Sequence, residues 1–166
     1  MSGYSGGGKA LIERFEQDGA PAYRAYGLSL EHKHLPEMQV HAGLQEVPIF
    51  SPAVVPGFRG MLVEVPLPLR AMSVKSSAAD LGKALADHYA AEALVSVQQS
   101  EGMEEMLVAK AAAASDRLDL HVFASTDGSR ARLIATLDNL GKGASGAAVQ
   151  NLNLMTRQPE TEGLRL

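Results

Sequence analysis

Thr126-Asp127-Gly128-Ser129 separates two stretches in which apolar and polar side chains alternate, Arg117–Ser125 and Arg130–Asp138. Alternation with a period of two is typical of a β-strand that buries one face. Asp-Gly between two such stretches indicates a tight hairpin turn. The sequence therefore predicts an antiparallel hairpin, and His121, at a polar position of its first strand, is expected to face outward.

Further strands and helices are interspersed along the chain. Strands are predicted at residues 47–55, 60–69 and 93–98, and helices at residues 11–17, 36–42, 77–89 and 147–155. Pro66 and Pro68 cannot donate to a β-ladder, so the second half of the 60–69 strand either lies at a sheet edge or leaves the sheet. Because the clearest strand pair is a hairpin, the predicted fold class is α+β, with a mixed, largely antiparallel sheet and helices on one face.

Three further segments, residues 106–114, the last helix and residues 158–166, differ in how clearly their structure can be predicted. Residues 106–114 are ambiguous, because alanine favours a helix but the segment is short and lacks clear punctuation. In the last helix, Ala148, Leu152 and Met155 form a stripe that is expected to belong to the core. Residues 158–166 are polar and are expected to fray.

Length, charge and composition narrow the function classes. At 166 residues, the chain is expected to be one domain over residues 1–166. The net charge is −4 and no stripe of Lys or Arg is present, so no nucleic acid is expected as a partner. No apolar run is long enough to span a membrane, and the cytoplasm is the expected compartment. Cysteine is absent, which excludes a cysteine nucleophile and thiolate metal sites within this chain, and no metal site is predicted.

The segment Glu31-His-Lys-His-Leu-Pro-Glu-Met38 is a candidate site for proton transfer. Pro36 suits the start of a short helix that Gly43 would end. If His32 to His34 is extended, both imidazoles lie on one side, near the positive end of that helix. Two such rings fit proton transfer beside a thiolate or oxyanion. The alternative is that this segment merely borders a helix cap.

Two further features suggest anion binding. Gly3 to Lys9 has the spacing of a phosphate-binding loop, but Ala10 stands where a magnesium-binding Ser or Thr belongs, which argues against nucleotide hydrolysis. Backbone N–H groups at a helix start could still hold an anion, with Lys9 adding charge, or the segment could be a flexible start. Arg59, in the turn at residues 56–60, could grip a phosphate or carboxylate, or could simply be solvated.

Four stretches together resemble the N-acetyl-gamma-glutamyl-phosphate reductase family of arginine biosynthesis, in its shorter bacterial type. They are Ser2-Gly-Tyr-Ser-Gly-Gly-Gly-Lys9, His32-Lys-His-Leu-Pro-Glu37, Arg59-Gly-Met61 and Asp138-Asn-Leu-Gly-Lys-Gly-Ala-Ser-Gly-Ala-Ala-Val-Gln-Asn151. The resemblance runs in order over essentially the whole chain, and the last stretch is the most specific. It covers only the second half of the family's enzyme, the catalytic and dimerisation domain.

The resemblance implies a fold like the C-terminal domain of glyceraldehyde-3-phosphate dehydrogenase and a homodimer formed through the sheet. The implied reaction converts N-acetyl-gamma-glutamyl phosphate to the semialdehyde with NADPH, through a cysteine on the missing half. The implied site residues are His32 and His34 for acid/base catalysis, Ser5, Gly6, Lys9 and Arg59 for substrate binding, and Asn139, Gly143 and Gly146 for contact with NADP. Because the Rossmann domain is absent from this chain, NADP is expected to be held mainly elsewhere.

Two other functions remain open. The chain could be a binding or assembly module with no chemistry of its own, and the isolated chain is expected to be inactive in any case. It could also be the equivalent domain of the related lysine-pathway acyl-phosphate reductase, which shares the machinery but not the substrate.

Overall fold

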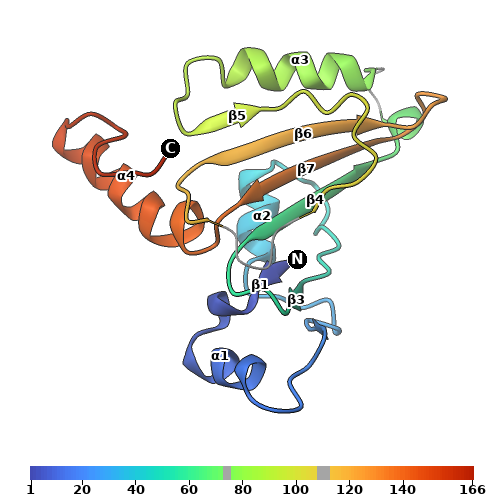
Figure 1. The fold of residues 1–166 in the computed structure, drawn as a ribbon. Coiled ribbons are helices and arrows are strands. Elements are labelled where there is room, and N and C mark those ends of the chain that lie inside the picture. Colours follow the sequence, from blue (N-terminus) through green and yellow to red (C-terminus); the bar gives the residue numbers. More distant parts are fainter. Residues whose placement is uncertain (73–75, 108–112) are drawn as a thin grey trace.

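The computed structural model of the protein describes residues 1–72, 76–107 and 113–166. Within these residues, seven strands form one mixed sheet in the order β2-β3-β1-β4-β7-β6-β5 (Figure 1). The strands are β1 (Ser2–Gly3), β2 (Arg24–Ala25), β3 (Ala53–Val55), β4 (Met61–Leu67), β5 (Val95–Val97), β6 (Leu118–Ala124) and β7 (Ala131–Leu137). Pairs β1–β3 and β5–β6 are parallel and the others are antiparallel, which confirms the predicted mixed, largely antiparallel sheet.

The predicted hairpin is confirmed as the β6–β7 pair. Ala124 lies opposite Ala131 at its closed end, and Leu118 lies opposite Leu137 at its open end. Gly128 has φ +64, a conformation that favours glycine. The Asp127 carboxylate accepts hydrogen bonds from the hydroxyls of Ser125 and Ser129 and from the Ser129 N–H. These bonds stabilise the carboxylate and lower the pKa of Asp127.

The prolines of the 60–69 stretch left two outcomes open for its second half: an edge of the sheet, or a departure from the sheet. The pairing of β4 shows which of them occurs. It pairs with β7 along all of Met61–Leu67, but with β1 only at Met61. The latter half of β4 is therefore an edge among the described strands, and Pro66 stays in register opposite Arg132. Pro68 lies beyond the strand, where it precedes the short helix η2 (Leu69–Ala71).

Four α-helices accompany the sheet: α1 (Lys9–Glu16), α2 (Leu35–His41), α3 (Ala78–His88) and α4 (Gly146–Thr156). In the view of Figure 1, α2 lies behind the sheet, α3 runs along the β5 edge, and α1 and α4 lie beyond its ends. The predicted helix at residues 77–89 is confirmed as α3, which begins with a capping box: Ser77 accepts from the Asp80 N–H while the Asp80 carboxylate accepts from the Ser77 N–H. Two other short helices are η1 (Tyr4–Gly7) and the π-helix η3 (Gly141–Ser145).

Several predicted strands are shorter than expected. Only Ala53–Val55 of the predicted 47–55 strand belongs to the sheet, because Pro48 and Pro52 cannot donate to a ladder. Only Val95–Val97 of the predicted 93–98 strand is paired. The ambiguous segment 106–114 stays undecided, because residues 108–112 lie outside the part of the chain that the structure describes.

The prediction for the buried stripe of α4 was wrong. Leu152 is 57% exposed and Met155 is 84% exposed, whereas Asn153 is buried. Asn153 donates from its amide to the carbonyls of Glu160 (3.0 Å) and Glu162 (2.9 Å). The segment after α4 therefore folds back onto the helix, and the expectation that residues 158–166 fray was wrong as well.

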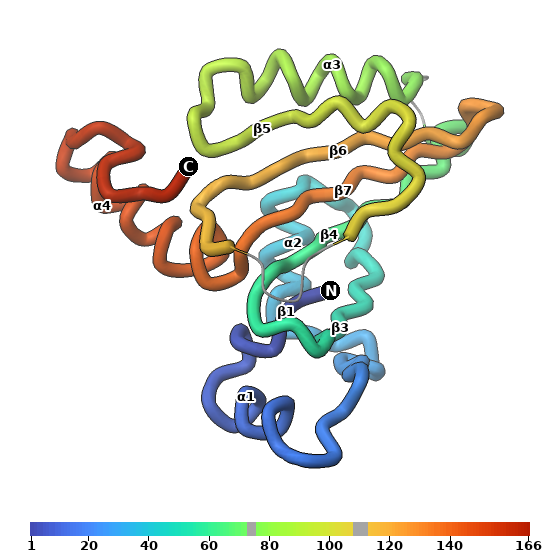
Figure 2. Tube along the Cα trace, viewed as in Figure 1, coloured from blue at the N-terminus to red at the C-terminus, as the bar shows by residue number. Residues whose placement is uncertain are grey.

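The outward placement expected for His121 was also wrong. Its side chain is only 8% exposed, and its Nδ1 lies 3.1 Å from the Ser100 hydroxyl. In Figure 2 the chain that leaves β5 crosses β6 and β7, and the contact with Ser100 shows that part of this crossing segment covers His121. In the described part of the chain, no helix is long and apolar enough to cross a membrane.

Candidate functional site

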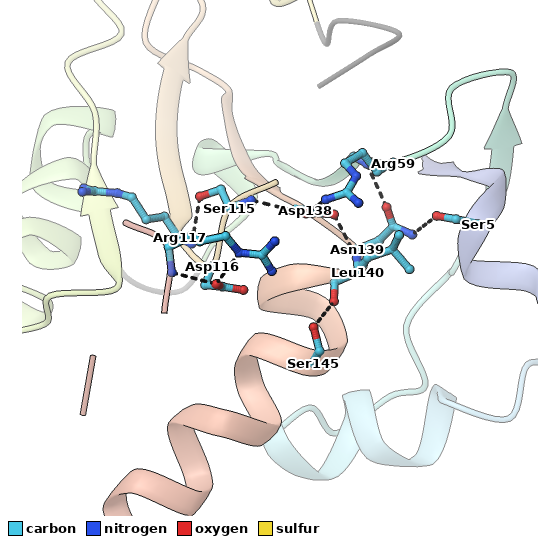
Figure 3. A network of polar contacts seen from close by, with 11 residues as sticks. Ser5, Arg59, Ser115, Asp116, Arg117, Asp138, Asn139, Leu140 and Ser145 are labelled. Atoms are coloured by element: carbon cyan, nitrogen blue, oxygen red, sulfur yellow. Dashed lines mark hydrogen bonds and ion pairs between the residues drawn. The ribbon is translucent and has the colours of Figure 1, made fainter. Parts of the chain in front are cut away.

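A polar cluster forms where the end of β7 meets the turn before β4 (Figure 3). Arg59 Nη1 lies 2.7 Å from Asp138 Oδ2, and the Gly60 N–H donates to Asn139 Oδ1 at 2.8 Å. The Asn139 amide in turn donates to Ser5 Oγ at 2.9 Å. Three segments that are far apart in the sequence are thus tied together by side chains from two adjacent residues, Asp138 and Asn139.

Asp138 is the centre of this cluster. Besides Arg59, its carboxylate accepts from the Ser115 N–H (3.3 Å) and the Leu140 N–H (2.9 Å). The carboxylate is buried, so these donors offset the cost of removing a charge from water. The Asp138 side chain therefore fixes the start of the Asp138–Ser145 turn relative to the sheet.

Ser5 and Gly6 reach the cluster because the turn at residues 57–59 packs against the start of the chain. The Tyr4 and Ser5 N–H groups donate to the carbonyls of Gly57 (2.9 Å) and Phe58 (3.1 Å). Gly3 has no room for a side chain, since a β-carbon there would lie 2.7 Å from the Gly57 carbonyl oxygen. A β-carbon on Gly6 would lie 3.4 Å from the Asn139 amide nitrogen.

The structure therefore brings together four of the residues singled out from the sequence, namely Ser5, Gly6, Arg59 and Asn139. Lys9 starts α1 and is exposed, with no hydrogen bond or ion pair from its side chain to any described residue. Arg59 is not simply solvated, as one sequence reading held, because Asp138 pairs with it and its side chain is only 23% exposed.

The two imidazoles form a second group. Their ring centroids are 4.9 Å apart, and the His32 ring also lies against Phe50 (5.0 Å) and Tyr26 (5.8 Å). The His34 N–H donates to His32 Nδ1 at 3.3 Å, so that nitrogen carries no proton and the proton of a neutral ring sits on Nε2. His32 is half-buried and His34 is exposed.

The local geometry at these imidazoles differs from the sequence expectation. Residues 33–34 form a turn, and His34 has φ −89 and ψ −4 as the N-cap of α2, so the segment is not extended. The rings are nevertheless adjacent, because the turn folds the His34 backbone over His32. The predicted helix at residues 36–42 is confirmed as α2, and Gly43 follows it with φ +62.

The imidazoles and the polar cluster lie at opposite ends of the short strands. Arg24 pairs with Val54 and Ala25 with Ala53 in antiparallel fashion, so the chain that leads from β2 to His32 leaves the sheet at the start of β3. Ser5 follows β1, which runs parallel to β3, and therefore lies past the far end. Across residues 1–72, 76–107 and 113–166, no hydrogen bond or ion pair joins the two groups.

The small-residue turn after β7 contains two different environments. Gly143 is exposed, with neighbours Ala144 and Ser145 also exposed. Gly146 is buried, and a β-carbon there would overlap the Asp116 carboxylate. Only the first part of the turn is therefore open to a flat ligand.

Sequence reasoning missed Ser115 and Asp116, which precede β6: Ser115 is hydrogen-bonded to Lys142 and Asp138, and Asp116 packs against Gly141 and Gly146. A cavity of about 400 Å³ adjoins this region and is lined by Gly60, Ser115, Arg117, His121 and Asp138 among others. The one signal for Asp116 in the sequence was an aspartate directly before a strand. Asp138, by contrast, opened the most specific stretch of the resemblance.

The chemistry available at these groups is proton transfer and anion binding. The His32 Nδ1 accepts from the His34 N–H, which leaves Nε2 as the other nitrogen of that ring, and the His34 ring is exposed beside it. Arg59 has N–H groups beyond the one that faces Asp138, and the exposed Lys9 ammonium lies at the amino-terminal end of an eight-residue helix.

Comparison with known proteins gives a consistent result. Residues 1–139 match the family described as "Semialdehyde dehydrogenase, dimerisation domain". The chain is 44% identical over 163 residues to the N-acetyl-gamma-glutamyl-phosphate reductase of Rhizobium meliloti, and 46% identical over 162 residues to that of Brucella ovis. Each match covers 93% of this chain and 52% of the relative, so the chain spans about half the length of the curated relatives it matches.

The fold has a solved counterpart. The structure of aspartate semialdehyde dehydrogenase II from Vibrio cholerae superimposes with a TM-score of 0.66 at 18% sequence identity. The match covers 93% of this chain and 52% of that chain.

Proposed function

The chain belongs to the semialdehyde dehydrogenase dimerisation-domain family, and we propose that it is the substrate-binding and dimerisation half of an N-acetyl-gamma-glutamyl-phosphate reductase. The observation that carries the proposal is the 44% identity to the Rhizobium meliloti reductase across 93% of the chain. We call the protein that joins this chain to a nucleotide-binding half with its cysteine the intact reductase. The chain alone is inactive, because it lacks that cysteine.

In the intact reductase, the thiolate of the other half attacks the acyl carbon and phosphate leaves. NADPH, held mainly by the other half, would supply the hydride to the thioester carbon, and the carbon–sulfur bond would break to release the aldehyde and regenerate the thiolate. On this chain, the exposed small residues Gly143, Ala144 and Ser145 fit close approach of a flat ring. Asn139 contributes by holding the turn, since both ends of its amide are already hydrogen-bonded within the chain.

His32 is the general acid/base. Its ring is packed against Phe50, Tyr26 and His34, and its tautomer is set by the His34 N–H, which leaves Nε2 as the atom that holds or moves a proton. Such preorganisation is what acid/base catalysis requires. His34, exposed beside it, orients the ring through its backbone and adds to substrate binding at the rim.

The phosphate is held by groups at the start of the chain. The Arg59 guanidinium is positioned by Asp138, which leaves its other N–H groups for an anion, and Ser5 and Gly6 line the same corner. Lys9, exposed at the start of α1, adds a positive charge near this end of the chain.

The intact reductase is a homodimer through the sheet of this domain. One face of the sheet carries a row of apolar side chains in register, Val65 opposite Leu133 and Leu133 opposite Val122. Val63 and Val65 on this face are 44% and 47% exposed, so a partner subunit would remove apolar area from water.

Two experiments separate this proposal from its competitors. The intact reductase is assayed with N-acetyl-gamma-glutamyl phosphate and with the carrier-linked acyl phosphate of the lysine pathway. Turnover of the first substrate alone supports the proposal, and turnover of the second alone assigns the related enzyme. An intact protein that turns over neither while still forming the dimer would be an assembly module.

A further inference from the structure

Asp116 is the most deeply buried charged side chain among the described residues, at 2% exposure. Its Oδ2 accepts from the backbone N–H of Arg165 (2.8 Å) and from Arg165 Nε (3.2 Å). The Asp116 N–H donates back to the Arg165 carbonyl at 2.8 Å. A residue just before β6 is therefore tied, in both directions, to the end of the chain.

The other oxygen, Oδ1, has no hydrogen-bond partner in the part of the chain that the structure describes. It lies against the backbone of two glycines in the turn after β7. A β-carbon on Gly141 would lie 2.8 Å from it, and one on Gly146 would overlap it. At Gly141 a side chain would overlap the Ser115 carbonyl oxygen before it met this carboxylate, whereas at Gly146 the carboxylate is the nearest atom, so Gly146 and Asp116 are matched to one another.

The same turn is also held from its outer side. Lys142 Nζ donates to Gln150 Oε1 (2.7 Å), and the Gln150 amide donates to Glu160 Oε1 (2.6 Å). Asn153 binds two carbonyls of the segment after α4. The turn thus contacts Asp116 and is linked through Gln150 to the segment 158–166, and Arg165 of that segment is bonded to Asp116.

We propose that Asp116 is a positioning residue that fixes the Gly141–Gly146 turn, and with it the exposed Gly143–Ser145 surface, against the carboxyl-terminal segment. The link to catalysis rests on the proposed function, in which the Gly143–Ser145 surface faces the nicotinamide. Asp116 itself touches neither substrate nor cofactor and acts through Gly141 and Gly146.

Electrostatics is consistent with this role. The π-helix η3 starts at Gly141 and continues directly into α4, so a carboxylate beside Gly141 lies at the positive end of this helical segment. The charges of Lys142 and Arg165 also stabilise the ionised form. These effects offset the burial of an oxygen that makes no hydrogen bond.

The test is a double-mutant cycle in the intact reductase. Gly146→Ala in the native background should raise the KM for NADPH by about tenfold or more while kcat stays within about threefold. Asp116→Ala also raises this KM, but adding Gly146→Ala to it should cost less than about threefold more, because the overlap with the carboxylate is gone and only the Gly141 carbonyl oxygen, 2.9 Å from the new β-carbon, remains close. Asp116→Asn, which keeps the shape and the acceptor for Arg165, should restore the KM to within about threefold of the native value.

Gly82→Ala in α3 is the matched glycine control, since a β-carbon there meets nothing within 4 Å. Equal KM effects of Gly146→Ala in both Asp116 backgrounds would overturn the inference. So would an Asp116→Ala variant that merely loses folded protein, with an unchanged KM for NADPH.

A second measurement on the 166-residue chain separates the inference from the proposed function. Asp116→Ala should speed amide hydrogen exchange at residues 141–146 by about tenfold or more, while Asp127→Ala at the hairpin tip leaves it unchanged. If the intact reductase shows no NADPH-dependent turnover at all, the proposed function fails, and this exchange experiment still decides the positioning role. Unchanged exchange in Asp116→Ala would overturn that role.

Discussion

The His32 ring is held on three sides by other rings, and the hydrogen bond from the His34 N–H fixes which nitrogen faces outward. Through that bond the His34 backbone orients the His32 side chain, and we propose on this basis that the two histidines have different roles. The two imidazoles are therefore not equivalent, and their replacement should separate catalysis from binding.

In the intact reductase, His32→Asn should lower kcat by about 10²-fold or more, since general acid/base catalysis contributes about 10²–10⁴-fold. The asparagine side chain keeps an acceptor near Nδ1 for the His34 N–H but has no atom at Nε2. His34→Asn should act mainly on the KM for the acyl phosphate. Steady-state kinetics on both variants measures the split.

His41 and His88 serve as controls, because both are exposed at the ends of helices. Their replacement by Asn should leave turnover within roughly threefold, as surface changes usually cost under about 0.5 kcal/mol. Near-normal turnover of both His32→Asn and His34→Asn in a folded protein would instead make this segment structural. His121 is unsuitable as a control, since it is buried against Ser100.

Asp116 should contribute to the pH dependence of stability. Burial raises its pKa, but hydrogen bonds from Arg165 and the charges of Arg165 and Lys142 outweigh that effect and lower the pKa below its ordinary value of 3.8. A lowered pKa in the folded state means that the stabilisation is present above the ordinary pKa and is lost as the pH falls through the folded value.

Urea unfolding at several pH values tests this expectation. Between about pH 5 and pH 2, the native chain should lose more free energy of unfolding than Asp116→Asn, since asparagine does not titrate. Asp127 and Asp80, whose pKa values are also lowered, titrate equally in both proteins. If the free energy of unfolding fell by the same amount in both proteins as the pH was lowered, the lowered pKa of Asp116 would be contradicted.

At the scale of single elements, α4 buries its polar side and exposes its apolar side. The buried Asn153 amide donates hydrogen bonds to two backbone carbonyls in the segment after the helix. Leu152 and Met155 face away from the body of this domain. The period of the helix could be predicted from the sequence, but the buried side could not, because it depends on a returning segment with almost no apolar residues.

Asn153→Ala should lower the free energy of unfolding by about 1–3 kcal/mol, since it leaves two carbonyls without a donor. Chemical denaturation gives this value directly. Asn151→Ala, on the exposed side of the same helix, should change stability by under about 0.5 kcal/mol. Equal effects at both positions would mean that the segment 158–166 does not depend on Asn153.

The hairpin and the capped helix α3 were predictable, because their signals are local: strict alternation, Asp-Gly, and a serine three residues before an aspartate. The burial of His121 and the pairing of Arg59 with Asp138 were not. Each depends on a contact between residues more than twenty positions apart, which no local period encodes. The turn at residues 33–34 is a local feature, but local sequence did not predict it, because two histidines with one residue between them suit a strand as well as a turn.

For the whole molecule, the exposed apolar face of the sheet predicts a dimer of about twice the 17.5 kDa chain mass. Val65→Arg should convert it to a monomer, because a charge would be buried between the two faces. Val40→Arg, which changes an exposed valine on α2 rather than on a strand, should leave the dimer intact. Multi-angle light scattering reads out both, and a native chain that is monomeric at high concentration would count against the dimer.

The central claim is that this chain is one half of an N-acetyl-gamma-glutamyl-phosphate reductase and depends on its other half for chemistry. Its most direct test is the NADPH oxidation rate with N-acetyl-gamma-glutamyl phosphate, measured side by side for the intact reductase and for the 166-residue chain. The account predicts turnover by the intact reductase, and neither turnover nor calorimetric binding of NADP at micromolar concentration by the chain alone. Turnover by the isolated chain, or an intact protein that is folded and dimeric yet inactive with this substrate, would contradict it.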